Sequence, residues 1–145
     1  MKWNLTYSVN DFHQWALNED EIKVGLRYNG EAHTLRVHSD DKRLFFLERT
    51  GVLQSRILLK TEYSVEIGEA YFEKNRRAGM MLLNEKKYFF KVIGNDLKLF
   101  NRQKELIFEI DVADIDNLEL FEFSALLFGT GIVSNKFGEK LQAMV

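Results

Sequence analysis

Residues 118–133 read Leu-Glu-Leu-Phe-Glu-Phe-Ser-Ala-Leu-Leu-Phe-Gly-Thr-Gly-Ile-Val and form one apolar stretch in a sequence of 145 residues. At helical spacing, apolar side chains fill one face of this stretch and much of the remaining surface: Leu120, Phe121, Phe123, Ala125, Leu126, Leu127 and Phe128. A helix that is apolar nearly all round is buried in a protein or in a membrane. The pattern predicts a helix that has Asp114 or Asp116 as its N-cap and continues through Phe128.

Two alternatives to a buried helix stay open at this point. A transmembrane helix needs about 20 apolar residues, and Glu119 and Glu122 would be costly at the centre of a bilayer. We therefore favour a core helix over a transmembrane one, while the alternation of residues 118–123 leaves a strand open for the first half. We expect Gly129 and Gly131 to end the helix and residues 132–133 to add a last strand.

The preceding part of the chain is dominated by patterns of β type. Some ten such segments run from residue 3 to residue 112, separated by turn residues at intervals of roughly ten residues. At the start, for example, apolar side chains alternate with polar ones in the period of a half-buried strand: Trp3, Leu5, Tyr7 and Val9. At the end, residues 106–112 show the same period.

Turn signals between these segments predict hairpins. Asn29-Gly30 stands between two β-type runs and predicts a type I′ turn, in which both central residues need positive φ. Residues 80–93 predict a second hairpin, which turns at Asn84-Glu85. We also expect residues 63–67 to form a strand closed by Gly68, and residues 11–17 to form a short helical turn.

The composition limits the classes of protein to consider. With 46% hydrophobic and 29% charged residues, the chain is globular, and its length fits a single domain of residues 1–145. The absence of cysteine excludes disulfides and thiolate metal sites. Residues 1–10 contain no apolar run of the secretory kind, so we expect a cytoplasmic protein. A net charge of −2 argues against a general nucleic-acid binder.

The fold that these patterns favour is mainly β, with one buried helix. We predict an antiparallel β-barrel or strongly curled sheet of about ten to twelve strands, packed around a hydrophobic C-terminal helix. The successive hairpins, the stretch Tyr63-Ser64-Val65-Glu66-Ile67-Gly68 and residues 118–133 resemble the tubby C-terminal-like superfamily, over residues 22–133. Its members include phospholipid scramblases and LURP-one-related proteins. The resemblance implies a twelve-stranded barrel threaded by a hydrophobic helix, but no site residue, because no phosphoinositide-contacting position matches.

Motifs of known chemistry are incomplete in this sequence. Ser124 lacks the flanking glycines of a nucleophile elbow, and Gly129-Thr130-Gly131 lacks the third glycine of a dinucleotide site. His33 and His38, if they share a strand, point to opposite faces and could not chelate one metal. We therefore predict no catalytic residue, no metal site and no cofactor.

Charge segregation is the most informative functional signal. Residues 74–104 contain nine basic residues and two acidic ones, whereas residues 105–122 contain seven acidic residues and no basic one. One interpretation is cross-strand pairing of the two segments. The other is an anion-binding site, whose residues would have to lie at one end of the fold: Lys74, Arg76, Arg77, Lys86 and Lys87.

Together these observations favour a non-catalytic binding module for an anionic lipid headgroup or an acidic protein partner. The alternative is a small-molecule carrier or small enzyme with a ligand cavity inside the barrel.

Overall fold

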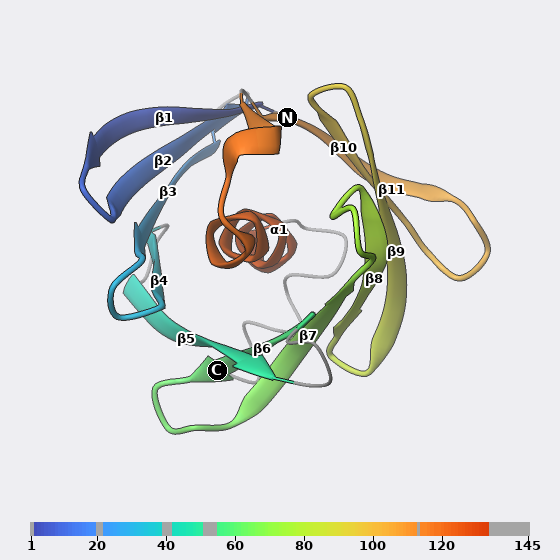
Figure 1. Cartoon of the computed structure of the whole chain (residues 1–145), viewed down its shortest axis with the longest axis horizontal. Coiled ribbons are helices and arrows are strands. Elements are labelled where there is room, and N and C mark those ends of the chain that lie inside the picture. The colour runs from blue at the N-terminus through green and yellow to red at the C-terminus, as the bar shows by residue number, and fades with distance from the viewer. Residues whose placement is uncertain (1, 20–21, 39–41, 51–54, 113, 134–145) are drawn as a thin grey trace.

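The computed structural model describes residues 2–19, 22–38, 42–50, 55–112 and 114–133. In this part of the chain, eleven strands form a closed barrel (Figure 1). The strands are β1 (Lys2–Val9), β2 (Phe12–Glu19), β3 (Ile22–Asn29), β4 (Thr34–His38), β5 (Lys42–Thr50), β6 (Arg56–Thr61), β7 (Glu66–Phe72), β8 (Ala78–Leu83), β9 (Lys86–Ile93), β10 (Asp96–Phe100) and β11 (Leu106–Val112). A 3₁₀ turn, η2 (Ile115–Asn117), leads into the helix α1 (Leu120–Val133).

The barrel closes between its first and last strands. Each strand pairs antiparallel with the next one in sequence, so an odd number of strands leaves β1 and β11 running in the same direction. They pair in parallel, with Lys2 opposite Asp111 and Trp3 opposite Val112. Among the described residues, the closed barrel therefore has no free edge strand. The alternative prediction of a strongly curled sheet, which would have left two edge strands, does not apply.

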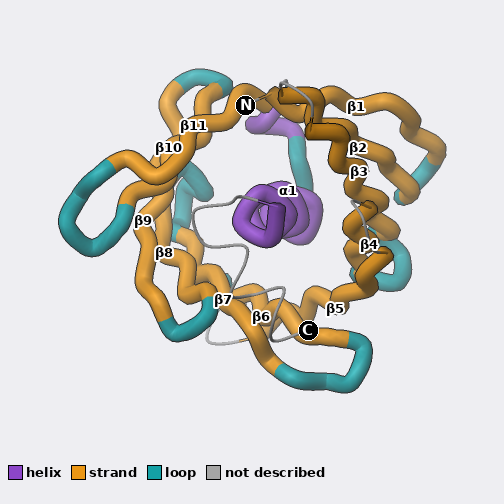
Figure 2. The backbone as a smooth tube through the Cα atoms, turned by 180° about the vertical axis from the view of Figure 1, so that it is seen from behind, coloured by secondary structure: helices purple, strands orange, loops and turns teal. Residues whose placement is uncertain are grey.

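Helix α1 lies on the axis of the barrel. Seen along that axis from either side, the strands form a ring around the helix (Figures 1 and 2). The side chains of Phe123 and of residues 125–128 are buried and join one core with the inward-facing side chains of the strands. The prediction of a β-barrel around a hydrophobic helix is thus confirmed. No helix among the described residues is long and apolar enough to cross a membrane.

The predicted end of the helix is wrong. Gly129 and Gly131 lie inside α1, and residues 132–133 belong to the helix rather than to a strand. The reason is a close approach to the sheet: a Cβ atom on Gly129 would lie 2.6 Å from Leu26 Cδ1. Glycine lowers helix propensity by about 1 kcal/mol relative to alanine, and the tight packing on β3 offsets that cost. The strand alternative for residues 118–123 is wrong as well, because α1 begins at Leu120.

Three local predictions also need correction. Residues 11–17 form no helical turn, because residues 12–19 are strand β2, which pairs with β1 and with β3. Asn29-Gly30 does open a hairpin, but the connection has four residues, and the Asn29 side-chain oxygen accepts bonds from the backbone N–H groups of Glu31 and Ala32. Tyr63 lies in the β6–β7 connection and is 80% exposed, while β7 continues through Gly68.

Candidate anion-binding site

The barrel has two ends that differ in their connections. We call the end at which α1 begins the proximal end and the end at which α1 finishes the distal end. Because odd-numbered strands all run toward the proximal end, the described connections at residues 30–33 and 73–77, which follow β3 and β7, lie there. The connection at residues 84–85 follows the even-numbered strand β8 and lies at the distal end.

The five basic residues of the predicted site do not come together. Lys74, Arg76 and Arg77 lie in the β7–β8 connection at the proximal end, whereas Lys86 and Lys87 open β9 at the distal end. The six residues of β8 separate the two groups by roughly 20 Å at the usual rise of a strand. The prediction that both groups share one end is therefore wrong, since Asn84 and Glu85 form a tight turn that sends β9 back along β8.

The proximal group sits on an ordered loop. The Glu73 backbone N–H donates to the Ala78 carbonyl over 3.0 Å, and the Arg76 N–H donates to the Glu73 carbonyl over 2.9 Å. The Asn75 side-chain oxygen accepts from the Arg77 N–H over 2.9 Å. These bonds shape the turn of the loop, in which Arg76 has a positive φ of 60°.

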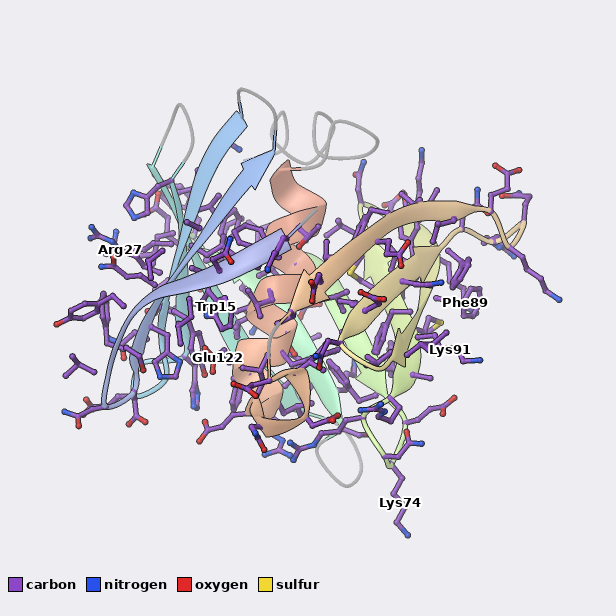
Figure 3. All side chains as sticks on the ribbon, turned by 90° about the horizontal axis from the view of Figure 1, so that it is seen from above. Trp15, Arg27, Lys74, Phe89, Lys91 and Glu122 are labelled. Carbon is purple, nitrogen blue, oxygen red and sulfur yellow. The ribbon has the colours of Figure 1, made fainter. Side chains whose placement is uncertain are left out.

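Within this loop the three basic side chains have different surroundings. The Arg77 guanidinium forms an ion pair with Asp116 of η2, so it ties the loop to the segment that leads into α1. Lys74 and Arg76 are exposed. Lys74 extends away from the barrel at the end of the molecule where Glu122 lies (Figure 3). The two exposed cations are thus available to a ligand at the proximal end.

A groove of about 350 Å³ runs beside this loop; we call it the proximal groove. It is lined by Arg49, Ser55, Phe72, Glu73, Lys74, Arg76 and Leu120. Three of these residues are cationic and one is acidic, so the lining carries a net positive charge. Phe72 and Leu120 are buried and form an apolar floor. The Phe72 ring packs against the rings of Phe90 and Phe123, with centroids 5.2 and 5.5 Å apart, which fixes its position.

A second polar cluster lies near the same end but inside the barrel. Glu122 in the first turn of α1 is only 3% exposed. Its carboxylate accepts a hydrogen bond from Trp15 Nε1 over 2.9 Å and lies 2.5 Å from His13 Nδ1. The other ring nitrogen of His13 lies 3.2 Å from the Asn10 carbonyl. Both ring nitrogens are therefore engaged, and the cluster anchors α1 to β2 instead of presenting a general base.

Tyr28 stands beside this cluster. Burial raises the pKa of its phenol, because the charged phenolate is poorly solvated there, and the negative charges of Glu119, Glu122 and Asp11 raise it further. The phenol is thus kept neutral within the barrel.

Part of the charge segregation is explained by pairing between strands. Lys98 of β10 and Glu109 of β11 are directly opposite each other, and Lys98 Nζ lies 3.8 Å from Glu109 Oε1. At the distal end, Lys87 Nζ lies over the Phe89 ring, 5.6 Å from its centroid. Lys98 on a strand and Arg77 in the proximal loop are thus paired with residues of the acidic segment.

Arg49, Phe72 and Leu120 are missed by the sequence-based prediction. Arg49 is near the end of β5 and Leu120 begins α1, so both are far from the basic loop in sequence. A correct strand count would have grouped them, because β5 and β7 both finish at the proximal end, where α1 begins. The predicted end of a strand at Gly68 lies inside β7 and obscures that count.

Among the residues that the structure describes, no three histidine or acidic side chains are placed to hold a metal ion. Compared with known proteins, the chain matches no protein family, no curated protein and no solved structure.

Proposed function

We propose that the protein is a non-catalytic binding module that holds the phosphate of an anionic lipid headgroup in the proximal groove. The observation that carries this proposal is the combination of Arg49, Lys74 and Arg76 with an apolar floor in one groove. Guanidinium and ammonium groups donate charge-assisted hydrogen bonds to phosphate oxygens.

The apolar floor favours a lipid over a fully polar anion. Phe72 and Leu120 offer a surface for the glycerol and the first methylene groups of a lipid, next to the cations that would bind its phosphate. The groove opens at the proximal end of the barrel, and the exposed loops at that end could approach a flat membrane. The proposal places the protein at the cytoplasmic leaflet, whose lipids are anionic.

The carrier alternative requires a cavity on the barrel axis. Helix α1 occupies that axis, and its side chains from Glu122 to Thr130 are buried. A ligand inside the barrel would therefore have to displace the helix, whereas a ligand in the proximal groove would not.

The test is co-sedimentation of the full chain with vesicles of phosphatidylcholine, alone or mixed with phosphatidylserine. We expect recovery only with the mixed vesicles, and we expect it to weaken as salt rises. Each cation near an anionic surface contributes about 1 kcal/mol, so Lys74→Glu with Arg76→Glu should weaken binding at least about tenfold.

The chain offers a matched control. Lys86→Glu with Lys87→Glu makes the same change in net charge at the distal end. We expect this variant to bind mixed vesicles nearly as well as the unaltered protein. Equal losses in the two variants would mean that binding follows net charge and not the groove. Equal recovery with both kinds of vesicle would rule out the lipid and leave an acidic protein as the partner.

A further inference from the structure

The outer face of β1–β5 carries an unusual row of side chains. The strand register places Tyr7, Gln14, Arg27, Arg36 and Leu44 in line across the five strands. The adjacent row contains Phe12 and Phe46. Neither row contains an acidic residue. We call these two rows the arginine face.

Two arginines stand at the centre of this face. Arg27 and Arg36 are directly opposite each other on β3 and β4, and both are exposed. Like charges in that position destabilise a sheet. Neither guanidinium forms an ion pair with another residue in the described part of the chain. The pair thus costs stability within the monomer and is suited to binding an acidic group from outside.

Apolar side chains surround the arginines. A groove of about 350 Å³ is lined by both arginines together with Phe12, Leu44 and Phe46. Phe46 is 38% exposed and Tyr7 is 50% exposed, and the Tyr7 and Phe12 rings meet edge to face at 6.1 Å. Arginine and aromatic residues without acidic neighbours are the composition that distinguishes the cores of protein–protein interfaces.

The arginine face is separate from the exposed basic and aromatic side chains of β9, on the other side of the barrel. Figure 3 shows Arg27 on one side of α1, and Phe89 and Lys91 on the other. It is also distinct from the proximal groove, with which it shares no lining residue. An occupant of the arginine face therefore need not compete with a ligand of the groove.

We propose that the arginine face docks a partner protein through a segment that combines a carboxylate with an apolar side chain. The carboxylate would bind between Arg27 and Arg36, and the apolar side chain would fill the groove between Phe12 and Phe46. Addition of a partner strand is excluded as the mode of binding at this face, because β1–β5 are paired on both sides. A single-stranded nucleic acid fits less well, since two cations provide few of the phosphate contacts that such complexes need.

The experiment selects ligands from a random peptide library displayed on phage, with the full chain as bait. Selected peptides are synthesised, and their affinities are measured by fluorescence polarisation. We expect the selected peptides to be rich in Asp or Glu next to aromatic or aliphatic residues. Arg27→Glu with Arg36→Glu should weaken their binding at least about tenfold, because a buried charge pair is lost. Arg27→Gln with Arg36→Gln tests the same point should the first variant fail to fold.

Lys74→Glu with Arg76→Glu is the matched control here, because it changes net charge equally at the proximal groove. This variant should bind the peptides as the unaltered protein does. Peptides without acidic residues, or equal affinities for all variants, would overturn the proposal. So would an oligothymidine that binds through Arg27 and Arg36 while no peptide is selected. Loss of vesicle binding with peptide binding intact would affect only the proposed lipid function.

Discussion

Trp3 and Thr130 lie 127 positions apart in the sequence, and the Trp3 indole N–H donates a hydrogen bond to Thr130 Oγ1 over 2.8 Å inside the core. The Thr130 hydroxyl in turn donates a hydrogen bond to the Leu126 carbonyl over 2.8 Å, so it acts both as an acceptor and as a donor. Trp3 is on β1 next to β11. The bond therefore fastens the closing pair of strands to the helix on the axis.

Thr130→Val should destabilise the protein by about 1–3 kcal/mol, because it leaves a buried indole N–H without an acceptor. Urea unfolding followed by tryptophan fluorescence would measure this loss. Ser124→Ala is the control, since the Ser124 hydroxyl donates to the Leu120 carbonyl of the same helix. A loss for Ser124→Ala as large as that for Thr130→Val would mean that the contact with Trp3 contributes little.

Gly129→Ala should destabilise the protein although alanine favours a helix. The new Cβ would lie 2.6 Å from Leu26 Cδ1, so either α1 or Leu26 has to move. Overpacking of this kind costs about 1–3 kcal/mol, and the better helix propensity of alanine offsets about 1 kcal/mol of that cost. We expect Leu26→Val to recover part of the loss in the double variant, which a double-mutant cycle in urea would show. A Gly129→Ala protein as stable as the unaltered one would contradict the close packing of α1 on β3.

These two contacts mark the limit of prediction from the sequence. The β9 hairpin could be predicted because its turn is local: Asn84 and Glu85 both adopt positive φ, 52° and 64°. The helix could be predicted because its side chains are apolar all round. The position of Gly129 inside the helix could not be predicted, because the residue that packs against it is Leu26, about a hundred residues earlier in the sequence.

The same distinction applies to the candidate site. Lys74 and Arg76 could be proposed because they are close in sequence and their neighbours in the sequence are polar. Grouping them with Lys86 and Lys87 failed because proximity in sequence was taken for proximity in space, whereas β8 carries the chain to the other end of the barrel. Arg49 joins the groove only through the barrel topology.

Tyr28 should make the protein less stable at alkaline pH. Its pKa is raised in the folded state, so the unfolded phenol ionises first, near its ordinary value of about 10. The free energy of unfolding is therefore unaffected below that pH and falls as pH rises above it. Tyr28→Phe should reduce this fall, and it should cost little at neutral pH because the hydroxyl has no hydrogen-bond partner among the described residues.

The measurement is urea unfolding of both proteins at several pH values from neutral to strongly alkaline. Tyr71 and Tyr88, whose pKa values are also raised, remain in both proteins. The difference between the two curves thus reports Tyr28. Parallel curves over the whole range would show that the Tyr28 phenol is not held neutral by the fold.

Leu127→Asp should abolish soluble folding. Leu127 is 0% exposed, and an unpaired carboxylate in the core costs several kcal/mol, comparable to the whole stability of a small domain. Leu106→Asp, at a half-exposed position of β11, should express as a folded protein. Solubility and circular dichroism distinguish the two outcomes. A folded Leu127→Asp protein would be incompatible with a helix packed on the barrel axis.

Asp116→Asn should strengthen the binding of anionic vesicles, a prediction that rests on the proposed lipid function. Asp116 neutralises Arg77 beside the proximal groove, and its removal would leave a third cation on the loop. One more cation near an anionic surface contributes about 1 kcal/mol, which corresponds to an affinity roughly fivefold higher. Stability should change little, because ion pairs at the surface contribute about 0–1 kcal/mol.

Glu109→Gln provides the control for net charge, because it also removes one carboxylate from an ion pair, with Lys98 on the side of the barrel. Co-sedimentation with vesicles of phosphatidylcholine and phosphatidylserine should show a gain for Asp116→Asn and none for Glu109→Gln. Equal gains would attribute binding to overall charge. Weaker vesicle binding by Asp116→Asn would mean that the ion pair holds the loop in the conformation that binds. Arg77 would then act by positioning its neighbours rather than through its own charge.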